Sequence, residues 1–173
     1  MSYAAERVNQ REYVGTIDEC ALNDAVAAVR CEGRVTCHLI EHEDDPTESM
    51  DFTLPAPGGG GARTPTAEVA SIALTSEFLV YGTTSGGVCY FHLPERVHVC
   101  EYKHGQGAVT TLKVNALGTR VVFVDERATP IFLNPVIDQT CHIPDFQGPA
   151  QAILWDATDP ECFVISNGAE YQV

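Results

Sequence analysis

One pattern recurs four times along this chain: an apolar run, a short polar turn and a second apolar run. Superposed at their turns, the four copies have equivalent points at Gly33, Gly86, Ala128 and Gly168. These points lie 53, 42 and 40 residues apart. The runs are rich in β-branched and aromatic residues, and apart from Asp24 to Val29 almost no segment has a helical period. The sequence therefore predicts an all-β fold built from repeats.

The first interval exceeds the second by roughly 11 residues, and residues 55–66, PAPGGGGARTPT, account for the excess. A stretch of this composition cannot bury enough apolar surface to offset the entropy of ordering it. We therefore predict a flexible Gly/Pro-rich insertion there. The remaining period of roughly 40 to 45 residues is that of a four-stranded β-propeller blade.

Dividing each unit into four strands predicts blades at about 19–54, 67–104 and 108–146, with a partial blade at 149–173. We also expect a strand of a preceding blade at residues 12–17. A blade buries its two apolar faces only against neighbours, and propellers close with about four to eight blades. The whole chain, 1–173, is thus predicted to be an incomplete WD40-like β-propeller. The rest of a longer polypeptide or a partner would supply the remaining blades.

The alternation within the strands predicts which side chains fill the layers between blades. We expect this role for Val80, Val88, Tyr90, Val122 and Val124.

Composition limits the classes of partner and the cellular setting that the sequence predicts. Ten basic against 24 acidic residues give a net charge of −14, which repels nucleic acids and anionic lipid headgroups. No apolar run has the length of a membrane span, and the amino-terminal stretch lacks the apolar core of a signal peptide. We expect a soluble intracellular protein without direct membrane insertion. Seven cysteines without a C-x-x-C pair are typical of reduced thiols.

Six short words carry a family resemblance: REYVGTI, CHLIE, LTSEFLVYGTTSGGVCYF, GTRVVFVDE, HIPDF and AILWD. In this order and spacing, between about Arg11 and Asp156, they resemble the WD-repeat-protein-nineteen family of intraflagellar transport complex A subunits. LTSEFLVYGT and GTRVVFVDE are the most specific of them.

The resemblance implies part of a second propeller, in a layout of two amino-terminal propellers followed by helical repeats. It implies a non-enzymatic scaffold without catalytic residues or cofactors, which supports retrograde ciliary transport and the entry of membrane receptors. Its partners would be other complex A subunits and cargo adaptors, at the ciliary base and along the cilium or flagellum. Two alternatives stay open: a scaffold of a related vesicle-coat complex, and a small-molecule or enzymatic propeller with its site in the channel.

GTTSGG, from Gly82 to Gly87, invites a phosphate-binding interpretation, because glycine-rich turns can offer backbone N–H groups to phosphates. The stretch lacks the lysine and the following hydroxyl of a P-loop, and the residues after it have the composition of a strand. We therefore predict a hairpin turn.

Two groups of side chains suggest other chemistry. Cys31, Cys37, His38 and His42 are residue types that bind zinc, but neighbours on a strand point to opposite faces, so no metal site is predicted. Four further histidines beside the cysteines suggest a thiol nucleophile with its base: His92, His98, His104 and His142. Lys and Arg are scarce near these thiols, so we predict no catalytic site.

Acidic residues gather in EHEDDPTE, from Glu41 to Glu48. Such a run is usually a solvated loop, and its alternative role is a contact for a basic partner. If the loop binds a partner, we expect the contact residues to be Glu43, Asp44 and Asp45.

Overall fold

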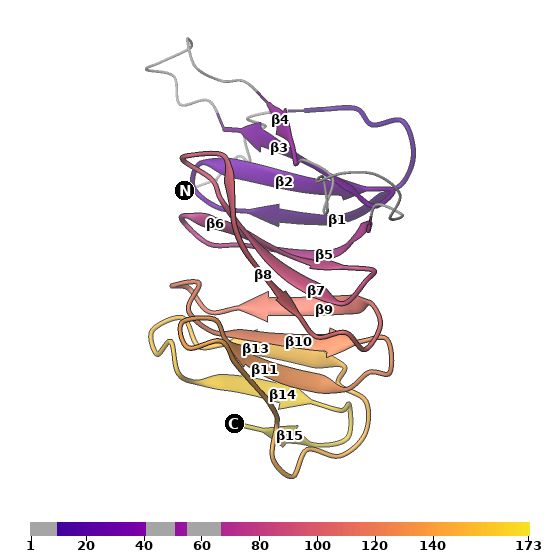
Figure 1. The fold of residues 1–173 in the computed structure, drawn as a ribbon, viewed down its shortest axis with the longest axis vertical. Helices are drawn as coiled ribbons and strands as arrows, with labels where there is room; N and C mark the ends of the chain where they lie inside the picture. The colour runs from indigo at the N-terminus through magenta and orange to yellow at the C-terminus, as the bar shows by residue number, and fades with distance from the viewer. Residues whose placement is uncertain (1–9, 41–50, 55–66) are drawn as a thin grey trace, which may run out of the picture.

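The computed structural model describes residues 10–40, 51–54 and 67–173, and within these ranges the secondary structure consists of strands without a helix. The strands form four antiparallel sheets, each following the order of the chain. Figure 1 shows the sheets stacked one on the next, and we call them blades 1 to 4. Among the described residues, no helix is long and apolar enough to cross a membrane.

Blades 1 to 3 each have four strands, and blade 4 has three. Blade 1 contains β1 (Ile17–Leu22), β2 (Val26–Cys31), β3 (Arg34–Leu39) and β4 (Phe52–Thr53). Blade 2 contains β5 (Val69–Leu74), β6 (Phe78–Thr83), β7 (Gly87–His92) and β8 (Val97–Lys103). Blade 3 contains β9 (Val109–Val114), β10 (Val121–Asp125), β11 (Pro130–Asn134) and β12 (Gln139–His142). Blade 4 contains β13 (Ala152–Trp155), β14 (Phe163–Ser166) and β15 (Tyr171–Gln172).

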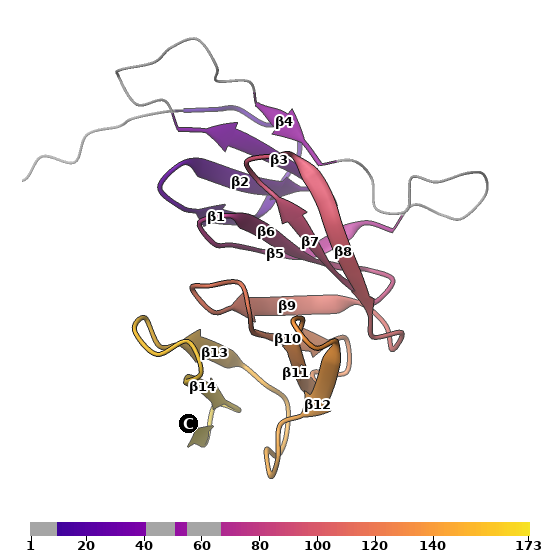
Figure 2. The same cartoon turned by 60° about the vertical axis from the view of Figure 1, so that its left-hand side comes forward.

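The first strands of consecutive blades contact one another: β1 lies against β5, β5 against β9, and β9 against β13. Figure 2 shows the same succession of sheets from a second direction. This stacking of four-stranded meanders through their first strands is the arrangement of propeller blades around an axis. The prediction of an all-β, incomplete propeller is confirmed.

The core consists of three layers between the blades. Strand β10 shows how they form, because all five of its residues are buried. Val121 and Phe123 enter the layer between blades 2 and 3, whereas Val122 and Val124 enter the layer between blades 3 and 4. A strand with period-two side chains thereby buries both faces of its sheet.

The expected layer residues of blade 2 also lie where the alternation placed them. Val80, Val88 and Tyr90 all belong to the layer against blade 3. Their neighbours Leu79, Tyr81, Cys89 and Phe91 face blade 1. The predictions for Val80, Val88, Tyr90, Val122 and Val124 are therefore confirmed.

A polar side chain follows the first strand of every blade and caps the turn to the second. These residues are Asn23, Thr75, Asn115 and Asp156, at intervals of 52, 40 and 41 residues. In each turn the side-chain oxygen accepts hydrogen bonds from backbone N–H groups two to five residues further on. Such local bonds stabilise the turn in place of the strand ladder. The repeat is therefore marked by its caps as well as by its strands.

Asn115 also joins blade 3 to blade 4. Its amide Nδ2 donates to the backbone oxygen of Pro160 at 2.9 Å and to the Thr119 hydroxyl at 3.1 Å, and the side chain is completely buried. Asn23 makes the corresponding bond between blades 1 and 2, since its Nδ2 donates to the backbone oxygen of Thr75.

The strand expected at residues 12–17 is wrong: residues 10–16 contain no strand, and Ile17 is the first residue of β1. Gly15 has a φ of +114°, which turns the chain where a strand would need extended backbone. The Tyr13 hydroxyl pairs with the His38 ring on β3, so this segment lies against blade 1. The stretch Asp24 to Val29, which had a helical period, enters β2. The predicted insertion at 55–66 lies outside the described residues.

We expect Asn115→Ala to lower the free energy of unfolding by about 2 to 3 kcal/mol, because it removes a turn cap and leaves buried backbone groups without partners. Urea unfolding followed by circular dichroism measures the loss. Asp156→Ala, which removes the exposed cap of blade 4, is the matched control and should have a smaller effect. Equal losses for the two variants would contradict the role of the bond between blades.

Candidate interaction surface

The meanders send their described turns to two opposite rims. The turns from first to second strand, and the turns from third to fourth strand of blades 2 and 3, lie at the left in Figure 1, and the turns from second to third strand lie at the right. We call these the first rim and the second rim. Turns at the ends of a rigid sheet are where propellers and other β-proteins present contact residues.

Blade 3 contributes an exposed apolar group to the first rim. Leu117 lies in the turn between β9 and β10, and Val136 and Ile137 lie in the turn between β11 and β12; all three side chains are exposed. The connection between β13 and β14 adds the exposed carboxylates of Asp156, Asp159 and Glu161 to the same rim. The first rim thus offers apolar side chains beside negative charge.

The acidic contact residues predicted at Glu43, Asp44 and Asp45 lie outside the described residues. In the sequence their segment falls between β3 and β4 of blade 1. The role of this loop stays a prediction.

GTTSGG forms the turn between β6 and β7 on the second rim. The Gly87 N–H donates to the Thr83 hydroxyl at 2.8 Å, and Gly86 has a φ of +84°, which glycine adopts without strain. Glycine is required at position 82 for a different reason, because a Cβ there would lie 2.5 Å from Cγ1 of Val109 in blade 3. The hairpin prediction is confirmed, and its glycines serve the turn and the close approach of two blades.

A buried polar pair lies between blades 2 and 3 and was not among the residues predicted from the sequence. The Nε2 atom of His104 lies 3.7 Å from Oδ2 of Asp125, and the two side chains are 10% and 2% exposed. Oδ1 of Asp125 accepts hydrogen bonds from the N–H groups of Arg127 and Thr129, both at 2.9 Å. The two side chains therefore lie where the connection after β8 meets the turn after β10. The DERAT turn is a sequence signal for the capping role of Asp125 but not for His104.

The residues considered for zinc do not form a metal site in the described part of the chain. Burial raises the pKa of the Cys37 thiol to about 12, which keeps it protonated, whereas a zinc ligand must be a thiolate. His38 instead lies between two other groups: its Nδ1 is 2.9 Å from Oδ2 of Asp51, and its Nε2 meets the Tyr13 hydroxyl. No group of three or more metal-binding side chains occurs among the described residues, and His42 lies outside them.

Among the thiols and histidines considered for catalysis, Cys89 is buried and two histidines lie beside carboxylates. Burial, together with the nearby Glu101 carboxylate, raises the pKa of Cys89 to about 12. A nucleophilic thiol needs the opposite shift. His92 lies 3.6 Å from Glu95 and His104 faces Asp125, while His98 and His142 occupy exposed strand positions.

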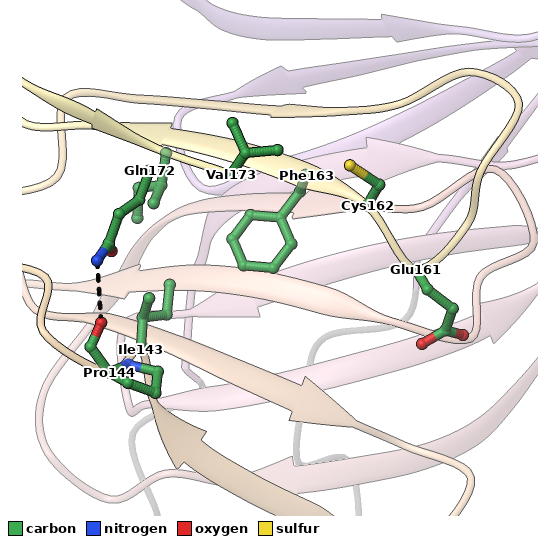
Figure 3. Close-up of a pocket in the computed structure, with 8 residues that line it drawn as sticks. Ile143, Pro144, Glu161, Cys162, Phe163, Gln172 and Val173 are labelled. Atoms are coloured by element: carbon green, nitrogen blue, oxygen red, sulfur yellow. Dashed lines mark hydrogen bonds between the residues drawn. The ribbon is translucent and has the colours of Figure 1, made fainter.

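A pocket of about 500 Å³ lies where the connection after β12 meets blade 4 (Figure 3). Ile143, Phe163 and Ile165 give it an apolar lining. Among its polar groups, Nε2 of Gln172 donates to the backbone oxygen of Pro144 at 3.2 Å and Glu161 pairs with Arg120, whereas Oε1 of Gln172 is buried without a hydrogen-bond partner. Specific small-molecule sites need several convergent polar groups, so a single available amide oxygen in this pocket does not favour the small-molecule alternative.

The pKa shifts predict an order of thiol reactivity. At pH 8 we expect iodoacetamide to modify the exposed Cys20 and Cys141 first, and to leave Cys37 and Cys89 unmodified until the protein unfolds. Peptide mass spectrometry of a time course reads the order. Fast modification of Cys89 in the folded protein would contradict the buried, protonated state described above.

Comparison with known proteins identifies relatives over most of the chain. The sequence model of the family described as WDR19 second beta-propeller matches residues 2–173. WD repeat-containing protein 19 of Homo sapiens is 35% identical over 155 residues, which are 88% of this chain and 11% of that protein. WD repeat-containing protein dyf-2 of Caenorhabditis elegans is 29% identical over 157 residues, which are 88% of this chain and 10% of that protein. The chain thus spans about a tenth of the length of these relatives.

Two solved structures resemble the fold. The β-propeller domain of Cps50 (Swd1) from Myceliophteria thermophila has a TM-score of 0.59 at 17% identity, over 85% of this chain and 51% of that one. KlHsv2 with loop 6CD replaced by a Gly-Ser linker has a TM-score of 0.66 at 10% identity, over 91% of this chain and 49% of that one. Together with the stacked four-stranded sheets, the match over residues 2–173 shows that this chain belongs to the WDR19 second β-propeller family.

Proposed function

We propose that this chain is a non-catalytic protein-interaction scaffold within a subunit of intraflagellar transport complex A. In that role it supports retrograde ciliary transport and the entry of membrane proteins into the cilium. The observation that carries the proposal is membership in the WDR19 family over residues 2–173. WD repeat-containing protein dyf-2 of Caenorhabditis elegans matches 88% of the chain and supports the same family membership.

The geometry suits a scaffold. Three buried layers hold the blades together, and the connecting turns stand at the two rims, where exposed residues such as Ile137 and Glu161 are available to a partner. Rigid sheets with exposed turns present a fixed surface, so partner binding does not require ordering of the scaffold. The described thiols with shifted pKa values are protonated, which argues against nucleophilic catalysis by Cys37 or Cys89.

The partners we propose are other complex A subunits and cargo adaptors, at the ciliary base and along the cilium or flagellum. The chain has a net charge of −14, so nucleic acid and anionic membrane surfaces are not proposed as partners. We also propose that the rest of a longer polypeptide or a partner supplies the remaining blades. A scaffold in a vesicle-coat complex would instead localise to vesicles, so localisation separates the two scaffold hypotheses.

Deletion of residues 10–173 from the full-length polypeptide tests the proposal. We expect the tagged deletion variant to lose at least one complex A subunit in co-purification and to be depleted from cilia, because the rims that bind partners are absent. The full-length polypeptide is the control. A deletion variant that retained every subunit and its ciliary localisation would contradict the scaffold function.

Charge reversal tests the acidic loop separately. We expect the triple variant Glu43→Lys, Asp44→Lys, Asp45→Lys to weaken binding of a basic partner by roughly tenfold at low salt. The difference should shrink as added salt screens the charges. If every subunit co-purifies as before at all salt concentrations, the loop is a solvated connection.

A further inference from the structure

Three large apolar side chains are exposed to solvent on the first rim of blade 3. Leu117 is 62% exposed, Val136 70% and Ile137 62%. They come from the turn between β9 and β10 and the turn between β11 and β12, which are neighbours because Val121 at the start of β10 pairs with Leu133 near the end of β11. We call these three residues, with Asp138, Asp159 and Glu161, the blade-3 rim patch.

Arg120 links the segments that form the patch. Its Nε and Nη2 atoms lie 3.1 and 3.0 Å from the Glu161 carboxylate, and its Nη1 donates to Oδ1 of Asn134 at 3.3 Å. One guanidinium thereby connects both turns of blade 3 with the β13–β14 connection of blade 4. The Asn115 bond to Pro160 fixes the same junction. A preorganised surface of this kind loses little entropy when a partner binds.

Blade 2 contains a turn of the same form, and it shows that the apolar residues are not needed for the turn itself. Both turns have four residues between the third and fourth strands, 93–96 in blade 2 and 135–138 in blade 3. The last residue has a positive φ in each, +54° at Arg96 and +51° at Asp138. Where blade 3 has the exposed Ile137, blade 2 has Glu95. The backbone of this turn therefore does not require isoleucine in this position.

The charge around the apolar group is mostly negative, although Lys103 lines a pocket together with Asp138. In the two turns and the β13–β14 connection the acidic residues are Asp138, Asp156, Asp159 and Glu161, and all four are exposed. Arg120 is the basic residue of these segments, and its charge is already paired with Glu161. A partner that covers Leu117 and Ile137 is therefore attracted if it brings positive charge to the edges of its apolar face.

We propose that the blade-3 rim patch binds a basic amphipathic helix of a partner protein. This inference rests on the proposed scaffold function and names the chemistry of one contact. The two turns are about two strand spacings apart, roughly 10 Å. Helix residues seven positions apart are separated by about 10.5 Å along one face, so two apolar side chains two turns apart can contact both turns. The patch consists of turns rather than a free strand edge, so an added β-strand has no ladder to extend there.

Fluorescence anisotropy with defined peptides tests the proposal on the full-length polypeptide. One labelled probe is a helical peptide of about 18 residues with leucines on one face and flanking lysines. A second has the same leucines with glutamates in place of the lysines. We expect saturable binding of the lysine peptide and at least about tenfold weaker binding of the glutamate peptide.

Ile137→Glu gives the discriminating result, because it installs the residue that blade 2 has in the same position. Nonspecific attraction to an acidic protein would make the lysine peptide bind this variant more tightly. The proposal predicts binding about tenfold weaker than to the unmodified protein, since an apolar anchor is lost. Glu95→Gln in the blade 2 turn is the matched control and should leave the affinity within about twofold.

Asp138→Asn supplies a second variant that preserves the turn, because asparagine also adopts the positive φ found there. It should weaken binding of the lysine peptide severalfold at low salt and less at high salt. Unchanged or tighter binding to Ile137→Glu, or equal binding of the two peptides, would overturn the proposal. If that occurred while deletion of residues 10–173 still removed complex partners, the patch assignment would fail and the scaffold function would stand.

Discussion

Burial of both faces of the sheets of blades 2 and 3 is the interaction on which the rest of the described structure depends. Strand β10 contributes Phe123 to one layer and Val122 to the next, and β6 and β7 do the same on either side of blade 2. Apolar burial stabilises a protein in proportion to area and has no preferred direction. Because each blade needs a neighbour on both faces, stacking also determines where the turns lie. The two rims, and hence the surfaces available to partners, follow from the core.

Directional polar bonds favour one relative placement of the blades, which non-directional apolar contacts alone do not specify. His104 and Asp125 face each other at 3.7 Å between blades 2 and 3, which is too far for a hydrogen bond. The bond from Asn115 to Pro160 connects blade 3 to blade 4, and the bond from Asn23 to Thr75 connects blade 1 to blade 2. Buried polar groups are costly unless they are paired, so these bonds favour one relative placement of the blades over slipped alternatives. The blade-3 rim patch inherits its rigidity from the same junction, through Arg120 and Glu161.

The strands, the hairpin turns and the stacked architecture could be predicted from the sequence because alternation and period are local signals. The caps escaped notice because each is a single residue per repeat, although Asn23, Thr75, Asn115 and Asp156 keep the repeat spacing. His104 and Asp125 are 21 positions apart and meet only once two blades stack, so no local pattern pairs them. The strand expected at 12–17 failed because Gly15 bends the chain. The exposed apolar residues on the rim of blade 3 could not be predicted from the sequence, because Val136 and Ile137 are residue types typical of strands.

Hydrogen exchange on the full-length polypeptide, free and within its assembled complex, tests the central claim most directly: stacked blades form a stable core that presents fixed rims to partners. The account predicts that the amides of β6, β7 and β10 exchange slowest in both states. It also predicts that residues 115–120 and 134–138 become more protected in the complex. Fast exchange along β10 would contradict the stacked core, and unchanged exchange at both rims would contradict the scaffold.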